Sequence, residues 1–521
     1  MFLYFDSTSY VMEIELKMPD LKKFLNTYTI ALCIIILGFL IIGSINLGNR
    51  IPDWDESAHY GQAKIILHPD LYKLCAIDPQ HCDIYPPKDF LGIPVPMYVD
   101  HPPFGKYIFA AALAVNESIE SGRFLILLFG AALIFATYML GKNFYSRKSG
   151  LLATVLTAIS IAVANYSRQM FPDVPLTFFL VSGILFFWFG SKNIKFAVIA
   201  GILAGLAILT KEPGLAILLP IAYISLTRYM SVKANIKEFS FDFKFSEKEK
   251  KNNFFIAIIV MLLVGIILYN VIGLMLYGSV PLLKNFEYHS AVGKFSGKNI
   301  DIIGYLGSMN AIVVLFPITL IAVIFFALRR KTEDIVILLA FIPFFIYTFT
   351  QGANNEFFKN PGWLHYLVVM VPFLSIMTAE FLLFVRSRWK TPVLIGIVII
   401  LAIAYLFLFY PYYFPTDKAE IYRPAIAELE TRISKDTPML TSYNSLAMRY
   451  YFGWKETHAI ETMNTDQIRL LILQNINRTS FNVLIQSDWE KYNETRKSLE
   501  GICPQQEIVI NQEEVFIVYL C

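Results

Sequence analysis

The segment Tyr28–Leu47, YTIALCIIILGFLIIGSINL, is followed almost at once by Ile51–Tyr60, IPDWDESAHY. The first stretch is a predominantly apolar run of about 20 residues, the length that crosses a bilayer as a helix. The second stretch places three carboxylates and a histidine where that helix leaves the membrane. Together they predict a polytopic α-helical membrane protein with its chemistry at the membrane surface.

The composition of the whole chain has the same character. Of its 521 residues 56% are hydrophobic and only 16% are charged, whereas soluble domains carry about 25% charged residues. Further apolar runs follow the first, so we interpret that run as a retained span and not as a cleaved signal peptide. The formal net charge of +3 is small, which gives no support to nucleic-acid binding.

Eleven apolar runs are long enough, or nearly so, to be membrane helices. They lie near residues 28–48, 123–140, 150–165, 174–190, 195–210, 213–229, 254–277, 311–328, 334–350, 363–385 and 391–410. With these spans, all the clusters of Lys and Arg fall on one side, at residues 22–23, 142–148, 192–195, 233–251, 329–331 and 386–390. The positive-inside rule then places the N-terminal segment 1–27 in the cytoplasm and the C-terminus outside.

The chain is expected to divide into a membrane domain, 28–410, whose first outer loop spans 49–122, and a tail, 411–521. In the tail charges return and apolar runs shorten. Helices are expected at 424–433, 465–475 and 490–501, and strands at 439–443, 481–486, 507–511 and 515–520. This alternation predicts a small extracytoplasmic α/β domain.

Four of the five cysteines fall on the predicted outer side, and Cys33 lies inside the first span. An oxidising compartment permits disulfides, which would join Cys75 to Cys82 and Cys503 to Cys521. Four free thiols are the alternative. A zinc site is less favoured, because the chain has no Cys-x-x-Cys spacing.

Asp55, Glu56 and His59 are the first candidates for chemistry. On a helix the two adjacent acids point about 100° apart, so one can act as a base while the other binds a cation. Asp55 and His59 are four residues apart and share a face that can orient a base or hold a divalent ion. The alternative is a solvated loop with an N-cap aspartate ahead of a surface helix.

A second polar cluster is His101–Tyr107, HPPFGKY. Its two prolines form a rigid extended element that would fix the direction of His101 and lead into a helix near Lys106. Lys106 and Tyr107 are then at the membrane surface. Anchoring in the headgroup layer is the alternative to a functional role for these two residues.

Charges also occur in turns too short to hydrate them. Arg168 and Asp173 lie between two apolar runs, and Lys211 lies between the fifth and sixth runs, which are both short. Charges at such depth are costly and usually functional. Local ion pairs, Arg168 with Asp173 and Lys211 with Glu212, are the alternative.

With Arg123, Lys359 and His365, these cations are predicted to form an outer ring of basic groups. No single member of the ring is specific, but the set faces acids that can act as bases. Such an arrangement suits a reaction on a lipid phosphate.

The order of these motifs resembles a known family. The motifs are Asp55-Glu56, His101–Lys106, Arg123, Arg168–Leu176, Gly205–Lys211 and His365-Tyr366-Leu367 ahead of Pro372. The sequence resembles GT-C-fold glycosyltransferases that use polyprenyl-phosphate sugars. More narrowly, it is similar to the dolichyl-phosphate-mannose protein O-mannosyltransferases and the ArnT-like aminoarabinose transferases, over residues 28–410.

The resemblance implies an inverting transfer from a dolichyl- or undecaprenyl-phosphate sugar to an acceptor hydroxyl, on the outer face of the plasma membrane. Asp55 would be the general base and Glu56 would assist it. The resemblance and the basic ring together assign the lipid phosphate to His101, Lys106, Tyr107, Arg123, Arg168, Lys211 and His365. Glu56, His59 and Asp173 are the candidates to hold a divalent ion, Mg, Mn or Zn.

Two departures from the family concern the acceptor. The loop 278–310 is too short for the β-trefoil module of eukaryotic protein mannosyltransferases, and the tail lacks the Trp-Trp-Asp motif of oligosaccharyltransferases. The expected acceptor is therefore a protein Ser or Thr, a glycan or a lipid, and not an asparagine.

Two other classes of function compete with this interpretation. A flippase or transporter for polyprenyl-linked sugars would also need buried charges facing a cavity, but here the charges cluster on the outer face and the halves show no inverted repeat. A membrane scaffold that displays the tail leaves the charged turns at Arg168 and Lys211 unexplained.

Overall fold

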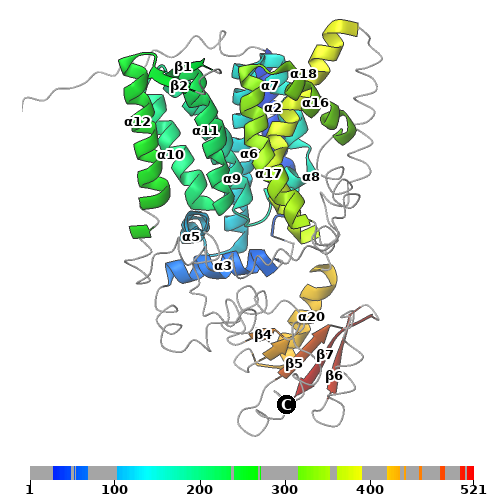
Figure 1. The fold of residues 1–521 in the computed structure, drawn as a ribbon. Helices are drawn as coiled ribbons and strands as arrows, with labels where there is room; N and C mark the ends of the chain where they lie inside the picture. Colours follow the sequence, from blue (N-terminus) through cyan, green and yellow to red (C-terminus); the bar gives the residue numbers. More distant parts are fainter. Residues whose placement is uncertain are drawn as a thin grey trace, which may run out of the picture.

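The computed structural model describes residues 27–48, 52, 54–68, 102–235, 240–267, 270–271, 315–352, 361–389, 419–434, 439–441, 457–459, 482–486, 505–510 and 513–520. Its helices form an elongated bundle, and a small sheet lies beyond one end of that bundle (Figure 1).

A helix lies at each predicted span that falls within the described ranges. The helices that run along the bundle are α2 (Thr27–Ser44), α6 (Ile119–Phe144), α7 (Arg147–Ala158), α8 (Ile161–Tyr166), α9 (Asp173–Gly190), α10 (Ile194–Thr210), α11 (Leu218–Ile224), α12 (Lys248–Leu262), α16 (Phe316–Arg329), α17 (Thr332–Gly352) and α18 (Val371–Trp389). Short 3₁₀ or π turns extend several of them, namely η2 (Glu212–Ile217), η3 (Ser225–Tyr229), η4 (Leu263–Ile267) and η5 (Pro361–Met370). The predicted span 391–410 lies outside the described residues.

Length and composition mark the bundle as a membrane domain. Five of the described helical segments are long and apolar enough to cross a bilayer. Large apolar side chains on the outside of the bundle, such as Ile34 on α2 and Leu328 on α16, are exposed. Apolar residues point outward as well as inward, which is the pattern of a helix bundle solvated by lipid.

Small residues allow the helices to pack closely. The buried face of α10 consists largely of Ala and Gly, including Ala197, Ala200 and Ala204, and it packs against α9 and α12. Gly141 of α6 and Gly150 of α7 approach so closely that a Cβ on Gly141 would lie 2.9 Å from the Cα of Gly150. Such contacts between small residues let membrane helices associate without a hydrophobic driving force.

The break predicted between the fifth and sixth spans is confirmed. Helix α10 ends at Thr210, Lys211 is extended, and η2 begins at Glu212 with Pro213 in its first turn. Proline has no N–H to donate to an α-helix and clashes with the preceding turn, so α10 does not continue through this position.

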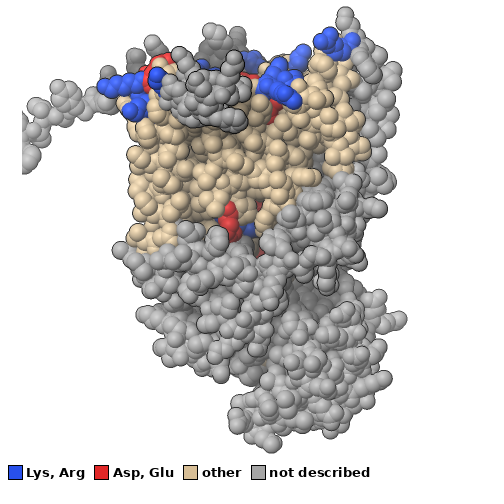
Figure 2. Space-filling model, viewed as in Figure 1, with Lys and Arg blue, Asp and Glu red and all other residues tan. Residues whose placement is uncertain are grey.

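The two ends of the bundle differ in charge. Lys and Arg gather at one end, which we name the basic end, and a belt of uncharged side chains separates it from the other (Figure 2). The links α6–α7, α9–α10 and α16–α17 all lie at the basic end, and they carry the basic clusters that the positive-inside rule used. The opposite end, named the site end, holds the short helices α3 (Trp54–Leu67) and α5 (Phe104–Val115) (Figure 1).

Two sheets accompany the bundle. An antiparallel hairpin at the basic end pairs β1 (Met230–Asn235) with β2 (Ser240–Phe245). The tail contains α20 (Ala419–Arg432) and a mixed sheet in the order β4-β3-β5-β7-β6. Its strands are β3 (Met439–Thr441), β4 (Thr457–Ala459), β5 (Asn482–Gln486), β6 (Gln505–Ile510) and β7 (Glu513–Leu520). The strands expected from the sequence are all present and β4 is additional, while the helices expected at 465–475 and 490–501 lie outside the described residues.

Candidate active site

Helix α3 brings the first candidate residues to the site end. It lies across the end of the bundle, roughly at right angles to the long helices (Figure 1). Asp55 and Glu56 occupy its first turn, where the positive end of the helix dipole stabilises carboxylates. Asp55 is exposed, whereas Glu56 and His59 are buried. The two adjacent acids therefore have separate environments, as their spacing on a helix predicted.

Glu56 forms a buried, two-pronged ion pair with Arg123 of α6. The guanidinium donates from Nε to Oε1 and from Nη2 to Oε2, both at 2.7 Å, and both side chains are 0% exposed. The backbone N–H of Met170 also donates to Oε1, at 2.9 Å. Removing one partner of a buried pair costs about 3–5 kcal/mol. Glu56 thus holds α3 against α6 and against the turn that precedes α9.

Two arginines bind backbone carbonyls in the last turn of α2 and in the short turn that follows its end at Ser44. Arg123 Nη1 donates to the carbonyl of Leu47 at 2.8 Å, and Arg168 donates to the carbonyls of Gly43 and Ile45 at 3.0 and 2.5 Å. The last carbonyls of a helix lack partners within it and carry the negative end of its dipole. These contacts hold α2 in the bundle. They do not support the phosphate role that the sequence suggested for Arg123 and Arg168.

A second buried ion pair joins the site ends of α9 and α10. The Lys211 Nζ lies 3.0 and 3.1 Å from the two carboxylate oxygens of Asp173, which is 38 residues away in the sequence. The two side chains are only 2% and 1% exposed. The same ammonium lies 4.1 Å from the centroid of the Tyr366 ring, within cation–π range. The sequence had suggested local pairs instead, Asp173 with Arg168 and Lys211 with Glu212, and so did not predict this pair.

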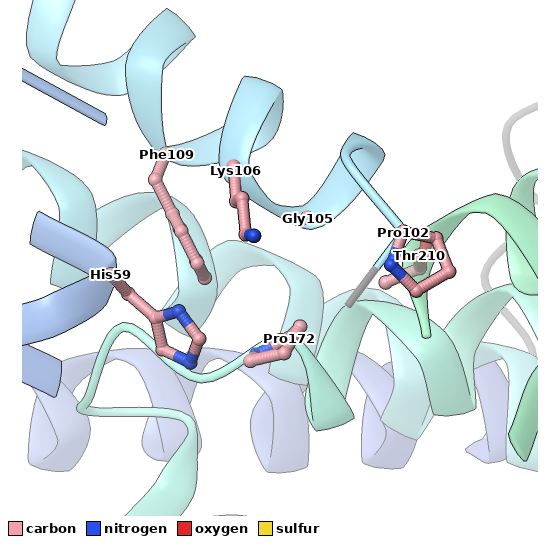
Figure 3. Close-up of a pocket in the computed structure, with 7 residues that line it drawn as sticks. All are labelled: His59, Pro102, Gly105, Lys106, Phe109, Pro172 and Thr210. Atoms are coloured by element: carbon pink, nitrogen blue, oxygen red, sulfur yellow. The ribbon is translucent and has the colours of Figure 1, made fainter. Parts of the chain in front are cut away.

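A narrow pocket lies beside this pair (Figure 3). Its lining residues are His59, Pro102, Gly105, Lys106, Phe109, Pro172 and Thr210. The Lys106 amine points into the space bounded by His59 and Pro172 (Figure 3). A Cβ on Gly105 would lie 2.9 Å from the Cβ of Pro172, so a glycine is needed for α5 to approach this turn. Pro172 and Thr210 directly precede Asp173 and Lys211, which places the pocket next to the second ion pair.

A row of rings connects the pocket with Lys211. His59 contacts Phe171 at a centroid distance of 6.0 Å, and Phe171 contacts His365 at 4.7 Å. His365 in turn lies 4.1 Å from the ring of Tyr366, which faces Lys211. Both histidines are buried, at 6% and 3% exposure. Lys106 and Lys211 are also buried, at 2% exposure each, and electrostatic interactions are strengthened where water has little access.

Several predicted residues lie elsewhere. Tyr107 is half-buried on α5, one residue beyond Lys106. Cys33 is a free, exposed thiol on α2. The remaining predicted positions, His101, Lys359, Cys75, Cys82, Cys503 and Cys521, lie outside the described residues.

The predicted metal ligands do not fit a metal site as they are arranged. Both carboxylate oxygens of Glu56 accept hydrogen bonds from Arg123, and both oxygens of Asp173 face Lys211. His59 lies among aromatic rings. Within the described part of the chain no three His, Cys, Asp or Glu side chains form a group that could hold a metal ion. We therefore derive no step through a metal.

Sequence reasoning missed two parts of the site. Tyr366 had entered only as part of the His365-Tyr366-Leu367 motif, although its ring covers Lys211. Phe171, which contacts both histidines, lay unremarked between Arg168 and Asp173. Its position in a turn between two charged residues was the available signal, because a large aromatic side chain in so short a turn must be buried.

Comparison with known proteins indicates the family to which part of the chain is similar. Residues 100–239 match the model of a family described as dolichyl-phosphate-mannose-protein mannosyltransferase. This segment contains Lys106, Arg123, Arg168, Asp173 and Lys211. No curated protein sequence matches the chain significantly.

Solved structures match nearly the whole chain. ArnT from Cupriavidus metallidurans, bound to undecaprenyl phosphate, is similar with a TM-score of 0.57 and 12% sequence identity, over 94% of this chain and 97% of that one. The same protein in its apo state gives a TM-score of 0.56 with the same identity and coverage. The resemblance drawn from the sequence motifs is thereby confirmed at the level of the fold. The chain is an integral, multi-pass membrane protein with the GT-C glycosyltransferase fold, similar to ArnT and to the protein mannosyltransferases.

Proposed function

We propose that the chain is a glycosyltransferase that moves a sugar from a polyprenyl phosphate to an acceptor hydroxyl at the outer face of the plasma membrane. One observation carries the proposal: an exposed carboxylate, Asp55, lies one helical turn before His59, which lines a pocket containing a buried lysine, Lys106. A base and cations at one membrane surface are the two components that such a transfer needs.

Asp55 acts as the general base. It accepts the proton of the acceptor hydroxyl as that oxygen attacks the anomeric carbon of the sugar, and the bond from that carbon to the phosphate oxygen breaks. The configuration inverts, and the electron pair leaves with the polyprenyl phosphate. Its exposure suits Asp55 to meet an acceptor that arrives from the aqueous side. A positioned base contributes about 10²–10⁴-fold to the rate.

Lys106 and Lys211 stabilise the phosphate that leaves. Both ammonium groups are buried, at 2% exposure each, and both lie at the pocket or beside it. In a water-poor site a cation stabilises developing negative charge far better than it does in water. The similar ArnT structure was solved with undecaprenyl phosphate bound, which supports a lipid phosphate of this kind as the leaving group here.

Glu56 positions the base. It has no exposed surface and both its oxygens are engaged, so it cannot take a proton from an incoming hydroxyl. By holding α3 against α6 it fixes the place of the neighbouring Asp55. The assisting role that the family resemblance implied for Glu56 is therefore to hold Asp55 in place through the ion pair with Arg123.

The test is transfer from radiolabelled polyprenyl-phosphate sugars in reconstituted vesicles. Asp55→Asn should reduce release of polyprenyl phosphate by about 10²-fold or more while the variant still binds donor. Glu120→Gln is the matched control, because Glu120 is an exposed carboxylate at the same end of the bundle and its removal should leave the rate unchanged. Offering a Ser/Thr peptide, a glycan and a lipid head group in parallel identifies the acceptor.

Two outcomes would overturn the proposal. One is full transfer activity in Asp55→Asn. The other is an absence of turnover with every donor while the chain moves the lipid-linked sugar between leaflets at a rate that Asp55→Asn leaves unchanged. The second result would identify a flippase.

A further inference from the structure

The ring of Tyr366 lies over the ammonium of Lys211, and the proposed function gives that ring no role. The Lys211 Nζ is 4.1 Å from the centroid of the ring, and 3.0 and 3.1 Å from the two carboxylate oxygens of Asp173. Lys211 is 2% exposed. A desolvated cation over the face of an aromatic ring is attracted by the ring quadrupole, so the carboxylate and the ring both hold this ammonium.

Neighbouring rings contact Tyr366 in turn. The imidazole of His365 has its centroid 4.1 Å away, with the two planes inclined at 35°. The Tyr347 ring, on α17, lies 6.0 Å away. His365 is itself buried and contacts Phe171. The ring of Tyr366 is therefore packed by side chains from its own turn and from α17, and packing of this kind restricts the directions that a side chain can take.

The two groups that hold Lys211 would respond differently to a phosphate. Asp173 carries a negative charge, which repels a second anion at the same ammonium. The ring of Tyr366 carries no net charge, so it can stay with the ammonium when an anion arrives. A lysine side chain is long and flexible, and ordering such a side chain on binding opposes binding. A ring that already holds the ammonium reduces that cost.

We propose that Tyr366 is a positioning residue, which keeps the Lys211 ammonium in place through the face of its ring while Asp173 releases that ammonium to the phosphate. The inference rests on the proposed function, because it takes Lys211 as a ligand of the lipid phosphate. Tyr366 acts through Lys211, and its hydroxyl is not required for this role.

Binding of undecaprenyl phosphate to the purified full chain tests the role of the ring face. Tyr366→Phe keeps the face and should bind the lipid nearly as tightly as wild type. Tyr366→Leu removes the face and should weaken binding by about fivefold. Equal weakening in the two variants would assign the effect to the hydroxyl and overturn the inference.

Fluorinated phenylalanines at position 366 separate the charge distribution of the ring from its shape. Each added fluorine draws electron density from the ring face, so the affinity for the lipid should fall step by step with fluorination. Tyr138 is the matched control, because its ring lies 5.8 Å from the Lys142 Nζ at the basic end. The same series there should leave the affinity unchanged. This series also carries the test if Tyr366→Leu fails to fold.

A double-mutant cycle shows whether Tyr366 acts through Lys211. Tyr366→Leu should cause no further loss of affinity in a Lys211→Gln background. An undiminished loss there would overturn the inference, because the ring would then act on the ligand without Lys211. If wild type binds the lipid and Lys211→Gln weakens binding, but fluorination does not, the inference alone fails. If wild type does not bind the lipid, the proposed function fails and the inference fails with it.

Discussion

The two ends of the bundle hold their buried charges in different ways. At the site end each acid meets one cation, Glu56 with Arg123 and Asp173 with Lys211, and these four side chains are at most 2% exposed. At the basic end one arginine, Arg329, serves two carboxylates. It donates to both oxygens of Asp334 at 2.7 and 2.6 Å and to Glu380 at 2.9 Å.

Two hydroxyl groups also donate hydrogen bonds to the carboxylates of the basic-end network. Tyr145 donates to Asp334 at 3.0 Å, and Ser149 donates to Glu380 at 2.7 Å. The network therefore joins the start of α17 to the end of α16, to the middle of α18, to the α6–α7 turn and to the first turn of α7. Arg329 and Glu380 keep 15% and 17% exposure, so water still helps to solvate them.

This difference indicates that the basic-end network has a structural role, whereas the site-end pairs belong to the candidate active site. A network with several donors and access to water tolerates the loss of one contact and keeps the helices in place. A fully buried pair of one acid and one cation does not tolerate such a loss, but a ligand that brings its own charge can take the place of one partner. Under the proposed function a lipid phosphate is such a ligand for Lys211.

The largest effect is expected from breaking the Glu56–Arg123 pair. Arg123→Met leaves the carboxylate of Glu56 buried without its cation, which should lower the free energy of unfolding by about 3–5 kcal/mol. Transfer should fall with it, because α3 then loses its attachment to α6. Denaturant or thermal unfolding in detergent, together with the transfer assay, measures both effects.

The double variant Glu56→Gln/Arg123→Met is the control for this prediction. It removes the stranded charge, so it should be more stable than Arg123→Met alone. Equal stability of the single and double variants would contradict the interpretation of these two side chains as a buried ion pair.

The second pair should respond through binding of the ligand. Asp173→Asn takes the counter-charge from Lys211, so polyprenyl phosphate should bind more tightly, by about tenfold for 1.4 kcal/mol. Lys211→Gln should weaken the same binding by a similar factor. Titration of each purified variant with polyprenyl phosphate provides the measurement. Weaker binding in Asp173→Asn would show that Asp173 helps to bind the ligand and does not compete with it.

A smaller effect is expected at the basic end. Arg329→Lys keeps a charge but cannot donate to Asp334 in two-pronged fashion, so stability should fall by about 1–3 kcal/mol. Donor binding and the transfer rate of the folded protein should stay close to wild type, because the network lies at the far end of the bundle. A loss of transfer equal to that in Arg123→Met would show that the basic-end network contributes to activity as much as the site-end pair does.

The sequence predicted the parts of this picture that depend on local patterns. Apolar runs and lysine clusters placed the helices, and the adjacency of Asp55 and Glu56 indicated that the two acids have separate roles. It could not predict partners that are distant in the sequence. Glu380 lies 51 residues from Arg329, and Arg329 had been used only as a marker of topology. Arg168 was expected at a functional site because it is a charge in a short turn, but the same depth is also explained by the carbonyl end of α2.

The smallest effect is expected at an exposed ion pair of the site end. The hydrogen bond with His68, 3.0 Å long, lowers the pKa of Glu117 below its ordinary value of 4.5, and Lys64 at 3.7 Å lowers it further. An acid whose pKa is lowered on folding stabilises the protein above its unfolded pKa, and this contribution is lost as the pH falls through the folded value. The side chain is 43% exposed, so solvent limits the contribution to about 0.2–1 kcal/mol.

Glu117→Gln should therefore melt slightly below wild type near pH 7, and the difference should vanish as the pH falls below about 4. High salt should also reduce it, because exposed pairs are screened. The buried Glu56–Arg123 pair should lose much less of its contribution to salt, so a salt titration of Glu117→Gln beside Arg123→Met separates the two kinds of pair. If both differences shrank alike, Glu56 and Arg123 would have to be accessible to ions, and the site end would be wetter than its packing indicates.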